Sequence, residues 1–410
     1  MDNVAITGRG VISSLGLTME DFNHALNTAH VAVEASPWVG KQHGLEHQWV
    51  SLVKGFDPAK YMDERTVRGT DLFARFSIGA AAEAINDAGV ELDPLRTAVV
   101  FGTCMSGIDA IVEEQEKLDR DGPEPVSGKM QIKAWPNMAA AQIAMIWQLH
   151  GPLLTVSTAC ASSLDAVGIA ARMIEAGQCD MAIAGGADAA RSQIFALTGG
   201  KYGIYSTASD PMKACIPFDV ERSGVINGEG AGFVVLERAD RARKRGATIH
   251  GYIRGYSCIA DASHPSSPEA EGTWEQRTME LALEEARLPR GADQVDAVIA
   301  HGTGTPVGDI VEVKALSRLF GKRDEAIPIM SPKGNFGHTV GAAGIMGLFA
   351  GLHSMQQNAL VPTAGTNNVI PEAKQVRVVT HEPAPTPIKT VQVNAFGFGG
   401  QDSSMVVTEA

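Results

Sequence analysis

The sequence predicts an α/β fold, in which short buried strands alternate with helices. Apolar runs rich in Val, Ile and Ala recur along the chain, and several lack the polar alternation of a half-exposed strand. Such runs are typical of strands that are buried on both faces. Helix-like stretches separate the runs, and many of the 44 glycines cluster at the ends of the runs. Strands that alternate with helices indicate α/β layers.

The predicted elements follow one another without a long linker. We expect strands over residues 98–101, 153–156, 181–184, 297–300, 327–330 and 391–395. We expect helices over residues 73–88, 139–148, 162–176, 275–286 and 340–355. Stretches rich in Ser, Pro, Glu or Gly predict loops over 122–128 and 257–273, and a stiff connector over 383–387. These segments are too short to separate domains, so we expect one compact body.

A weak internal repeat divides this body into two halves. Residues 84–89 precede the apolar run 98–101, which is followed by Gly102-Thr103. Residues 283–286 precede the run 297–300, and Gly302-Thr303 follow it closely. Both read as helix, short loop, strand and Gly-Thr, which suggests a duplicated α/β unit. We therefore predict an N-terminal half over residues 1–255 and a C-terminal half over residues 256–410.

Composition narrows the classes of function. The formal net charge of -13 makes the chain a poor binder of nucleic acid or of an anionic membrane. No signal-peptide pattern is visible, and no apolar run approaches the roughly 18–20 residues that span a bilayer. Five scattered cysteines favour a reducing cytoplasm and leave room for one reactive thiol. No cysteine or histidine cluster has zinc spacing, so we expect no metal.

The first segment with chemical potential is Thr155–Leu164, which contains Cys160. An apolar strand ends there and an Ala-rich helix begins, so Cys160 lies at a predicted helix N-terminus. Unpaired N–H groups and the helix dipole favour a thiolate at such a position, and the same N–H groups could hold an oxyanion. The alternative is a buried structural cysteine, which is common.

Two further segments contain histidines that follow predicted strands. His301 begins a Gly-Thr-rich stretch that runs to Asp309, at the strand edge where α/β sheets gather ligands. Ser331–Thr339 contains Lys333 and His338, and a helix follows. A helix N-terminus favours a neutral imidazole, which can donate an N–H to a developing enolate. The alternatives are a capped turn, a solvated lysine and a packed histidine.

The fourth segment, Asn394–Gly400, separates aromatic residues by glycines. Bulky and flexible residues together suit a gate over a pocket, for which Phe398 is the candidate. The alternative is a pair of core aromatics at a strand end. The four segments together supply a thiol, two imidazoles, an ammonium group and backbone donors. Those are the parts needed for acyl transfer followed by carbanion chemistry.

The four segments resemble, in order and relative spacing, the signature motifs of the β-ketoacyl-acyl carrier protein synthase family, the ketosynthases of fatty-acid and polyketide assembly. The resemblance implies a thiolase-like fold, with duplicated α/β halves in a five-layered αβαβα stack, and usually a homodimer. The N-terminal half would carry Cys160, and the C-terminal half would carry His301, His338 and Lys333.

The resemblance also implies a role for each matching residue. Cys160 would accept the acyl chain from the phosphopantetheine arm of an acyl carrier protein. His301 and His338 would assist decarboxylation of the malonyl group and stabilise the enolate. Lys333 would support the histidines, through Glu312. No diffusible cofactor is implied, because the substrates arrive on the carrier protein.

Further residues are implied by position. The N–H groups of Cys160 and Phe398 would form the oxyanion hole, and Thr303 and Thr305 would contact the pantetheine arm. Asp309 would join Glu312 in supporting the reacting groups from behind. Ile108 matches a residue of the acyl tunnel. Arg65 and Arg68 match a surface on which an acidic carrier protein would dock. The basic run over residues 238–245 reads instead as a solvated helix face.

Three neighbouring classes fit less well. Thiolases use a second cysteine near the C-terminus, whereas the last cysteine here is Cys258. Acetyl-CoA-primed synthases carry asparagine where this chain has His338, and chain-length factors lack the nucleophile. The family's last motif runs on into Thr-Asn, whereas Gln401-Asp402 stand here. This chain also leans towards polyketide ketosynthases over residues 159–164 and at Gly304. An alternative is therefore a subunit active only as a heterodimer with a chain-length-factor-like partner.

Overall fold

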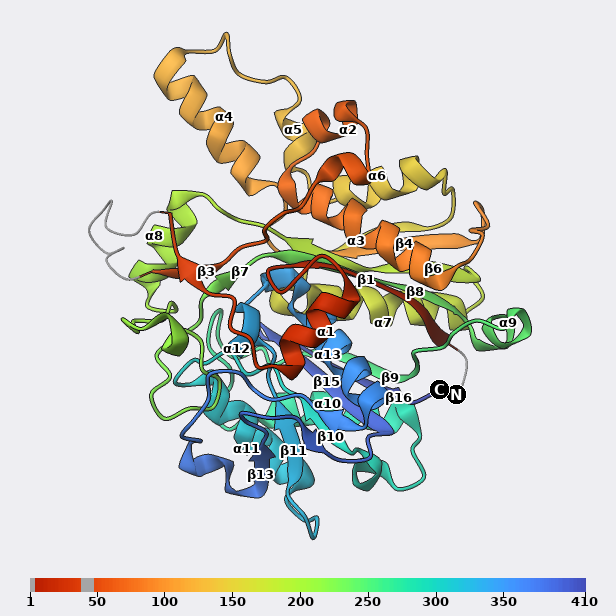
Figure 1. Ribbon diagram of the computed structural model, residues 1–410, viewed down its shortest axis with the longest axis vertical. Helices are drawn as coiled ribbons and strands as arrows, with labels where there is room; N and C mark the ends of the chain where they lie inside the picture. The colour runs from red at the N-terminus through yellow and green to blue at the C-terminus, as the bar shows by residue number, and fades with distance from the viewer. Residues whose placement is uncertain (1–3, 38–47) are drawn as a thin grey trace.

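The computed structural model describes residues 4–37 and 48–410 (Figure 1). Its main sheet has 11 strands. They are β1 (Val4–Ser13), β4 (Thr97–Gly102), β5 (Leu153–Val156), β6 (Met181–Asp188), β8 (Gly230–Arg238), β9 (Gly251–Ala260), β10 (Ala297–Ile299), β11 (Ile327–Met330), β13 (Val376–Val378), β15 (Thr390–Gly397) and β16 (Gln401–Thr408). Two small sheets hold β2 (Glu34–Ala35), β3 (Trp49–Ser51) and β7 (Asn227–Gly228), and β12 (Ala359–Leu360) and β14 (Ala384–Pro385).

Helices connect and cover these strands. The α-helices are α1 (Met19–Asn27), α2 (Glu64–Gly69), α3 (Leu72–Ala88), α4 (Ile108–Asp121), α5 (Met130–Ala134), α6 (Met138–Trp147), α7 (Ser162–Glu175), α8 (Gln193–Tyr202), α9 (Ala239–Arg245), α10 (Thr273–Ala286), α11 (Gly308–Phe320), α12 (Lys333–Phe336) and α13 (Ala343–Gln357). The 3-10 turns are η1 (Pro58–Lys60), η2 (Ala159–Ala161), η3 (Pro211–Lys213), η4 (Gly291–Gln294), η5 (Val340–Ala342) and η6 (Pro371–Gln375). Among the described residues, no helix is both long and apolar enough to cross a bilayer.

The strand order repeats from one half of the sheet to the other. In the first half the strands lie in the order β5-β4-β6-β8-β1, and in the second half the order is β11-β10-β15-β16-β9, with β13 added outside. Each half has two parallel pairings followed by two antiparallel ones. The halves meet where β1 pairs antiparallel with β9. The fold is therefore a duplicated α/β unit.

A glycine lies at the equivalent helix–strand contact in each half of the fold. A Cβ on Gly8 of β1 would lie 2.1 Å from the carbonyl oxygen of Ala84 in α3. A Cβ on Gly255 of β9 would lie 2.1 Å from the carbonyl oxygen of Ala282 in α10. Each helix therefore approaches the first strand of its half at a distance that only glycine permits.

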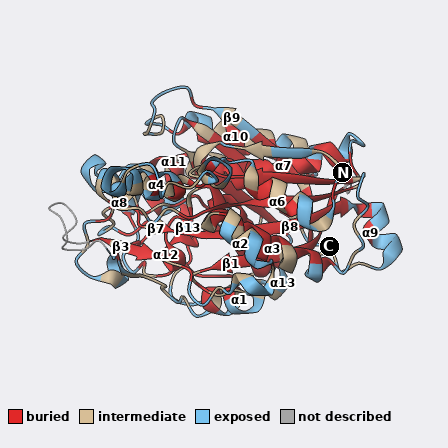
Figure 2. Cartoon of the chain, turned by 90° about the horizontal axis from the view of Figure 1, so that it is seen from above, coloured by how far each residue is buried: buried red, intermediate tan, exposed pale blue. Residues whose placement is uncertain are grey.

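The elements stack in five layers. Helices α7 and α13 pack against each other, α7 on β4 and β6 and α13 on β10 and β15, and so form the central layer. Helices α3 and α6 cover the outer face of the first half of the sheet, and α10 and α11 cover the second half. Figure 2 shows the strands buried and the exposed residues gathered on the helices and loops. The thiolase-like αβαβα prediction is confirmed.

The predicted strands and helices are found within a few residues, with informative exceptions. Residues 257–260, predicted as loop, continue β9 because they pair with Gln401–Ser404 of β16, a partner far along the chain. Strand β5 is not fully buried. Leu153 and Leu154 are 45% and 43% exposed, because β5 is an edge strand paired only with β4. The seam predicted near residue 255 falls inside β9, and the division at that residue stays a prediction.

The glycine contacts lead to a stability prediction. We expect Gly8→Ala and Gly255→Ala each to lower the free energy of unfolding by about 1–3 kcal/mol, because the added methyl group overpacks a strand–helix contact. Gly128→Ala is the control, since its Cβ would meet nothing within 4 Å. Urea unfolding of the three variants measures the effect. Equal stability of Gly255→Ala and Gly128→Ala would contradict the packing argument.

Candidate active site

The four predicted segments converge on one cavity of about 870 Å³. Its walls include Cys160, His301, His338 and Phe398, and Lys333 is buried behind His301. The segments follow β5, β10, β11 and β15, and all four strands end at the same side of their half of the sheet. The carboxyl ends of parallel strands are the usual position of a site in an α/β protein. The sheet thus brings together groups that are up to 238 residues apart.

The backbone at Cys160 forms a tight turn between β5 and α7. Ala159 has a φ of 49°, a conformation that non-glycine residues rarely adopt. Asp165 in α7 fixes the turn, because its carboxylate accepts a hydrogen bond from the Thr158 hydroxyl at 2.5 Å and another from the Ser403 hydroxyl. The nucleophile candidate is therefore positioned by contacts from both halves of the fold.

Burial and nearby groups shift the pKa of the Cys160 thiol in opposite directions. Burial raises the pKa of Cys160 to about 11, although the charge of Lys333 and the backbone N–H groups of Phe398 and Cys160 lower it. The backbone N–H groups favour the thiolate, as predicted for this position, but burial outweighs them. The N–H groups of Cys160 and Phe398 do lie beside the sulfur, as an oxyanion hole requires.

His338 contacts the thiol directly. Its Nε2 atom lies 3.1 Å from Cys160 Sγ. The backbone N–H of Val340 donates to Nδ1 at 3.0 Å, so a neutral ring carries its proton on Nε2. Burial and the charge of Lys333 hold the pKa of His338 well below its usual range. The ring therefore presents a neutral Nε2–H group to the cavity.

His301 is held in the same tautomer by a different group. Lys333 Nζ lies 3.3 Å from His301 Nδ1 and also donates to the His301 carbonyl oxygen. A lysine ammonium only donates, so Nδ1 accepts and the ring proton lies on Nε2. Burial lowers the pKa of His301 well below its usual range, and Lys333 and His338 lower it further. The two imidazole rings meet edge to face, with centroids 5.5 Å apart.

Glu312 supports the backbone at His301. Its two carboxylate oxygens accept the N–H groups of His301 and Gly302, each at 2.7 Å. Lys333 reaches His301 directly, and the opposite charges of Lys333 and Glu312 also act on each other, so the expected electrostatic link through Glu312 stays a prediction beside this contact. Burial raises the pKa of Glu312 to about 7, and the two N–H donors and Lys333 oppose that rise.

Asp309 holds the next part of the same loop. Its Oδ1 atom accepts the N–H groups of Thr303 and Gly304, each at 3.0 Å. The hydroxyl groups of Thr303 and Thr305 lie 2.9 Å apart, and both residues line the cavity. Glu312 and Asp309 both belong to α11, so one helix fixes the whole Gly-Thr loop.

Cys160, His301 and His338 are also residue types that bind metal ions. One ligand atom each from Cys160, His301 and His338 lie within 4.8 Å of one another. A metal would need the lone pair on the nitrogen that faces it. Val340 and Lys333 instead donate to the Nδ1 atoms and leave protons on Nε2. The arrangement fits two hydrogen-bond donors better than a metal.

Some predicted residues lie outside the cavity. Ile108 is half-buried at the start of α4 and is absent from the described cavity wall. Arg65 and Arg68 are exposed on α2, where Arg68 pairs with Glu64 at 2.5 Å. Phe398 is at the cavity wall and is 47% exposed, and its role as a gate stays a prediction.

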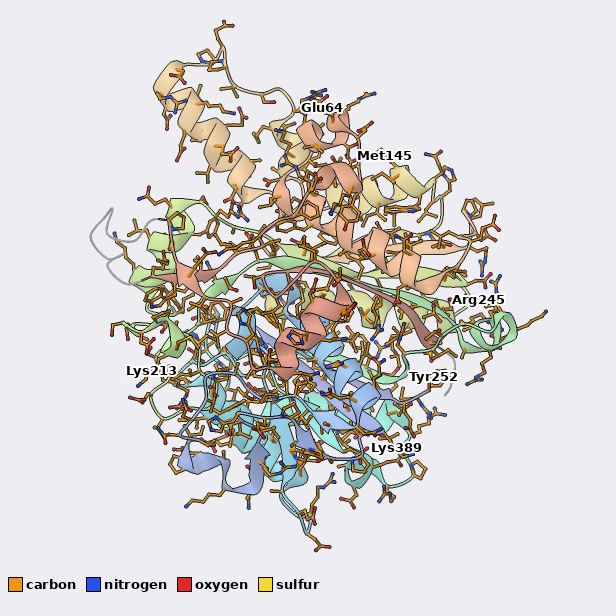
Figure 3. The ribbon with its side chains drawn as sticks, viewed as in Figure 1. Glu64, Met145, Lys213, Arg245, Tyr252 and Lys389 are labelled. Carbon is orange, nitrogen blue, oxygen red and sulfur yellow. The ribbon has the colours of Figure 1, made fainter. Side chains whose placement is uncertain are left out.

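The basic run before residue 246 is a solvated helix face, as predicted. Figures 1 and 2 place its helix, α9, and the cavity-lining helix α8 at opposite ends of the molecule. Figure 3 labels Arg245 on α9, where its guanidinium group folds back onto Glu237. Three arginines of the basic run already form ion pairs, which are Arg238–Asp240, Arg241–Asp180 and Arg245–Glu237.

Several buried acidic residues of the site are not among those predicted from the sequence. Asp188, Glu275 and Asp402 line the cavity, and Asp165 lies beneath Cys160. Burial, with neighbouring carboxylates, raises the pKa of Asp402 to about 7 and that of Glu275 well above its usual range. Asp188 had a readable signal, because a carboxylate directly follows the buried run that begins at Met181.

Removing the charge of Lys333 should move the pH dependence of the site. Lys333 lowers the pKa of His301, so Lys333→Met should raise that pKa. The neutral ring would then be lost at a higher pH as the solution is acidified. If the site decarboxylates malonyl groups, as the resemblance implies, the acid limb of that reaction should shift upward in pH, with Lys314→Met on the surface of α11 as control. An unshifted limb would contradict the contact between Lys333 and His301.

The chain matches two domains of one protein family along most of its length. The family model for the β-ketoacyl synthase N-terminal domain matches residues 1–242. The family model for the C-terminal domain matches residues 250–367. The 3-oxoacyl-[acyl-carrier-protein] synthase 2 of Vibrio cholerae is 33% identical over 98% of this chain and 98% of its own length.

Solved structures agree over the whole chain. The ishigamide ketosynthase/chain length factor is 26% identical with a TM-score of 0.92, covering 100% of this chain and 99% of that one. A type II polyketide acyl carrier protein in complex with its ketosynthase, bound to the hexaketide, gives 25% identity and a TM-score of 0.89, with 100% of both chains covered. With two domain models matched across most of its length, the chain belongs to the β-ketoacyl synthase family.

Proposed function

We propose that this protein is a β-ketoacyl-acyl carrier protein synthase of fatty-acid, type II polyketide or polyene biosynthesis. It would condense malonyl-carrier protein with an acyl chain held on Cys160, in a decarboxylative Claisen reaction. One observation carries the proposal. A thiol and the ring nitrogens of His301 and His338 lie within 4.8 Å of one another in a buried cavity. Family membership and the relatives named above support it.

The first step transfers the acyl chain to the enzyme. The sulfur of Cys160 attacks the thioester carbonyl on the pantetheine arm, and the N–H groups of Cys160 and Phe398 accept the oxyanion. Collapse forms the new carbon–sulfur bond, breaks the bond to the pantetheine sulfur and leaves the thiol proton on that sulfur. The charge of Lys333 and the two N–H groups lower the pKa of Cys160 and so favour the attacking thiolate.

The second step makes the carbon nucleophile. Malonyl-carrier protein enters, carbon dioxide leaves, and the electron pair of the broken bond moves into an enolate. His301 and His338 donate their Nε2–H groups to the enolate oxygen. A fixed donor of this kind contributes about 3–4 kcal/mol of transition-state stabilisation. No strong base is needed, because loss of carbon dioxide creates the charge.

The third step joins the two chains. The enolate carbon attacks the thioester on Cys160, and the same two backbone N–H groups accept the second oxyanion. The bond to Cys160 breaks, the β-ketoacyl chain leaves on the carrier protein, and the released thiolate takes a proton. Both substrates stay attached to phosphopantetheine or to Cys160, so we propose that no diffusible cofactor takes part.

The carrier protein would approach from the mouth of the cavity. Thr303 and Thr305 offer hydroxyl groups to the amides of the pantetheine arm, and Phe398 would gate its entry. Arg65 and Arg68 are exposed cations that suit an acidic carrier protein. Ile108 lies outside the described cavity wall, so its contact with the acyl chain stays a prediction. A relative bound to its acyl carrier protein supports this partner, and five free cysteines support a cytoplasmic setting.

A second subunit is the other proposed partner, because β5, one of the two edge strands of the main sheet in the described residues, is partly exposed and apolar. Leu153 and Leu154 of β5 are partly exposed, and Met145 and Ile146 of α6 are 52% and 38% exposed. Figure 3 shows Met145 at the outer surface. An exposed apolar sheet edge favours strand pairing between subunits. We propose a dimer through this edge, either of two copies or with a chain-length-factor-like partner, as one relative contains.

Acylation of the nucleophile is the direct test of function. We expect intact-protein mass spectrometry to show an acyl adduct after incubation with acyl-carrier proteins of several chain lengths. Cys160→Ala should remove the adduct, because no other thiol is paired with His338. Cys258→Ala, which alters an exposed thiol, should keep it. An unmodified Cys160 with every chain tested would contradict the proposal.

The oligomeric state separates the two kinds of dimer. If two copies pair, the chain expressed alone should elute as a dimer and condense malonyl and acyl substrates. Leu154→Lys should convert this species to a monomer, because it places charge on the apolar edge. A monomer that gains activity only with a second subunit would favour the heterodimer. A wild-type dimer that Leu154→Lys leaves intact would contradict pairing through β5.

A further inference from the structure

Asp188 is a buried carboxylate at the end of β6, and none of the reaction steps above uses it. Its side chain borders the cavity, and the residue is 1% exposed. It stands where β6 ends in the first half of the fold. The loop that follows His338 reaches it from the second half.

The carboxylate accepts five hydrogen bonds, four of them from backbone N–H groups. The donors are the Thr103 hydroxyl at 2.7 Å and the N–H groups of Cys104 at 2.9 Å, Met105 at 2.8 Å, Ser106 at 3.2 Å and Gly341 at 2.7 Å. Burial raises the pKa of Asp188, while the hydrogen bonds from Thr103, Cys104, Met105 and Gly341 lower it and favour the ionised carboxylate, which only accepts. One charge therefore ties the turn after β4 to the turn after His338.

Both of these turns contain a residue in a rarely populated conformation. Ser106 has a φ of 51° and Val340 a φ of 49°, although neither is glycine. Such conformations persist where surrounding contacts over-determine them, and they cluster at functional sites. Asp188 accepts the N–H of Ser106 itself and the N–H of Gly341, the residue after Val340.

The backbone turn at Val340 determines the tautomer of the His338 ring. The N–H of Val340 donates to His338 Nδ1 at 3.0 Å, which leaves the ring proton on Nε2. The peptides that carry the N–H groups of Val340 and Gly341 meet at the Cα of Val340, so the hydrogen bond from Gly341 to Asp188 restrains both. A Cβ on Gly341 would lie 2.5 Å from Asp188 Oδ2, so the two residues are in tight contact.

We propose that Asp188 is a positioning residue for His338. Through Gly341 and Val340 it would hold the imidazole in the tautomer and orientation that donate an N–H to the enolate. The inference rests on the proposed function. Asp188 has a second effect, on Cys160. Its negative charge raises the pKa of the Cys160 thiol and so disfavours the thiolate. Asp188 therefore favours decarboxylation while it restrains the thiolate.

Those two effects give a signature that loss of structure alone would not produce. Asp188→Asn keeps the size of the side chain but removes the charge and replaces one acceptor atom by a donor. We expect malonyl-carrier protein decarboxylation to fall on the order of 10²-fold, as for a misplaced catalytic group. We expect the pKa of Cys160, measured by iodoacetamide alkylation against pH, to fall. Asp188→Glu, which keeps the charge, should keep that pKa high.

A matched control and a second variant complete the experiment. Asp219 is also 1% exposed and accepts the backbone N–H groups of Asn367 and Asn368, but it does not line the cavity. Asp219→Asn should leave both readouts unchanged. Gly341→Ala should disturb the turn while keeping the charge, so decarboxylation should fall with the pKa of Cys160 unchanged. This variant tests the inference even if Asp188→Asn fails to fold.

The outcomes separate the inference from the proposed function. A wild-type protein that neither decarboxylates malonyl-carrier protein nor accepts an acyl chain would contradict the proposed function. An active wild-type protein with full decarboxylation in Asp188→Asn or Gly341→Ala would overturn the role of Asp188 alone. Equal loss in Asp219→Asn and Asp188→Asn, with no change in the pKa of Cys160, would overturn it too.

Discussion

The chemistry of this site depends on keeping two imidazole rings neutral, with their protons aimed at one point. Burial supplies the first condition, since it penalises the charged ring, and the ammonium of Lys333 reinforces it. Fixed donors supply the second, because Val340 and Lys333 occupy the Nδ1 atoms of His338 and His301. Fixed N–H donors in a site sheltered from water need little reorganisation when negative charge develops.

The fold provides these conditions through duplication. Each half contributes a sheet whose parallel strands end at the cavity, and the central helices α7 and α13 hold the halves together. Cys160 comes from the first half and both histidines come from the second, so the reacting groups meet across the boundary. Carboxylates bind the connecting loops. Asp165 fixes the turn at Cys160, Glu312 and Asp309 fix the loop after His301, and Asp188 links the two halves.

Much of this site could be predicted from the sequence, because it lies in short motifs at strand ends. Cys160, His301, Lys333 and His338 follow predicted strands, the resemblance to ketosynthase motifs implies their roles, and the structure brings them together. The duplication of the two halves is visible in the sequence only as a weak internal repeat. Long-range effects were not predictable. Residues 257–260 are strand only because β16 pairs with them, Lys333 contacts His301 directly, and the burial that raises the pKa of Cys160 depends on the complete tertiary structure.

The most direct test of the account is the protonation state of the two histidines. Nitrogen-15 NMR of histidine-labelled protein, assigned with His301→Gln and His338→Gln, reports the charge and tautomer of each ring. We predict that both rings are neutral at pH 7 with the proton on Nε2, and that they remain so below the ordinary histidine pKa of about 6.5. A cationic ring at pH 7, or a neutral ring with its proton on Nδ1, would contradict the account.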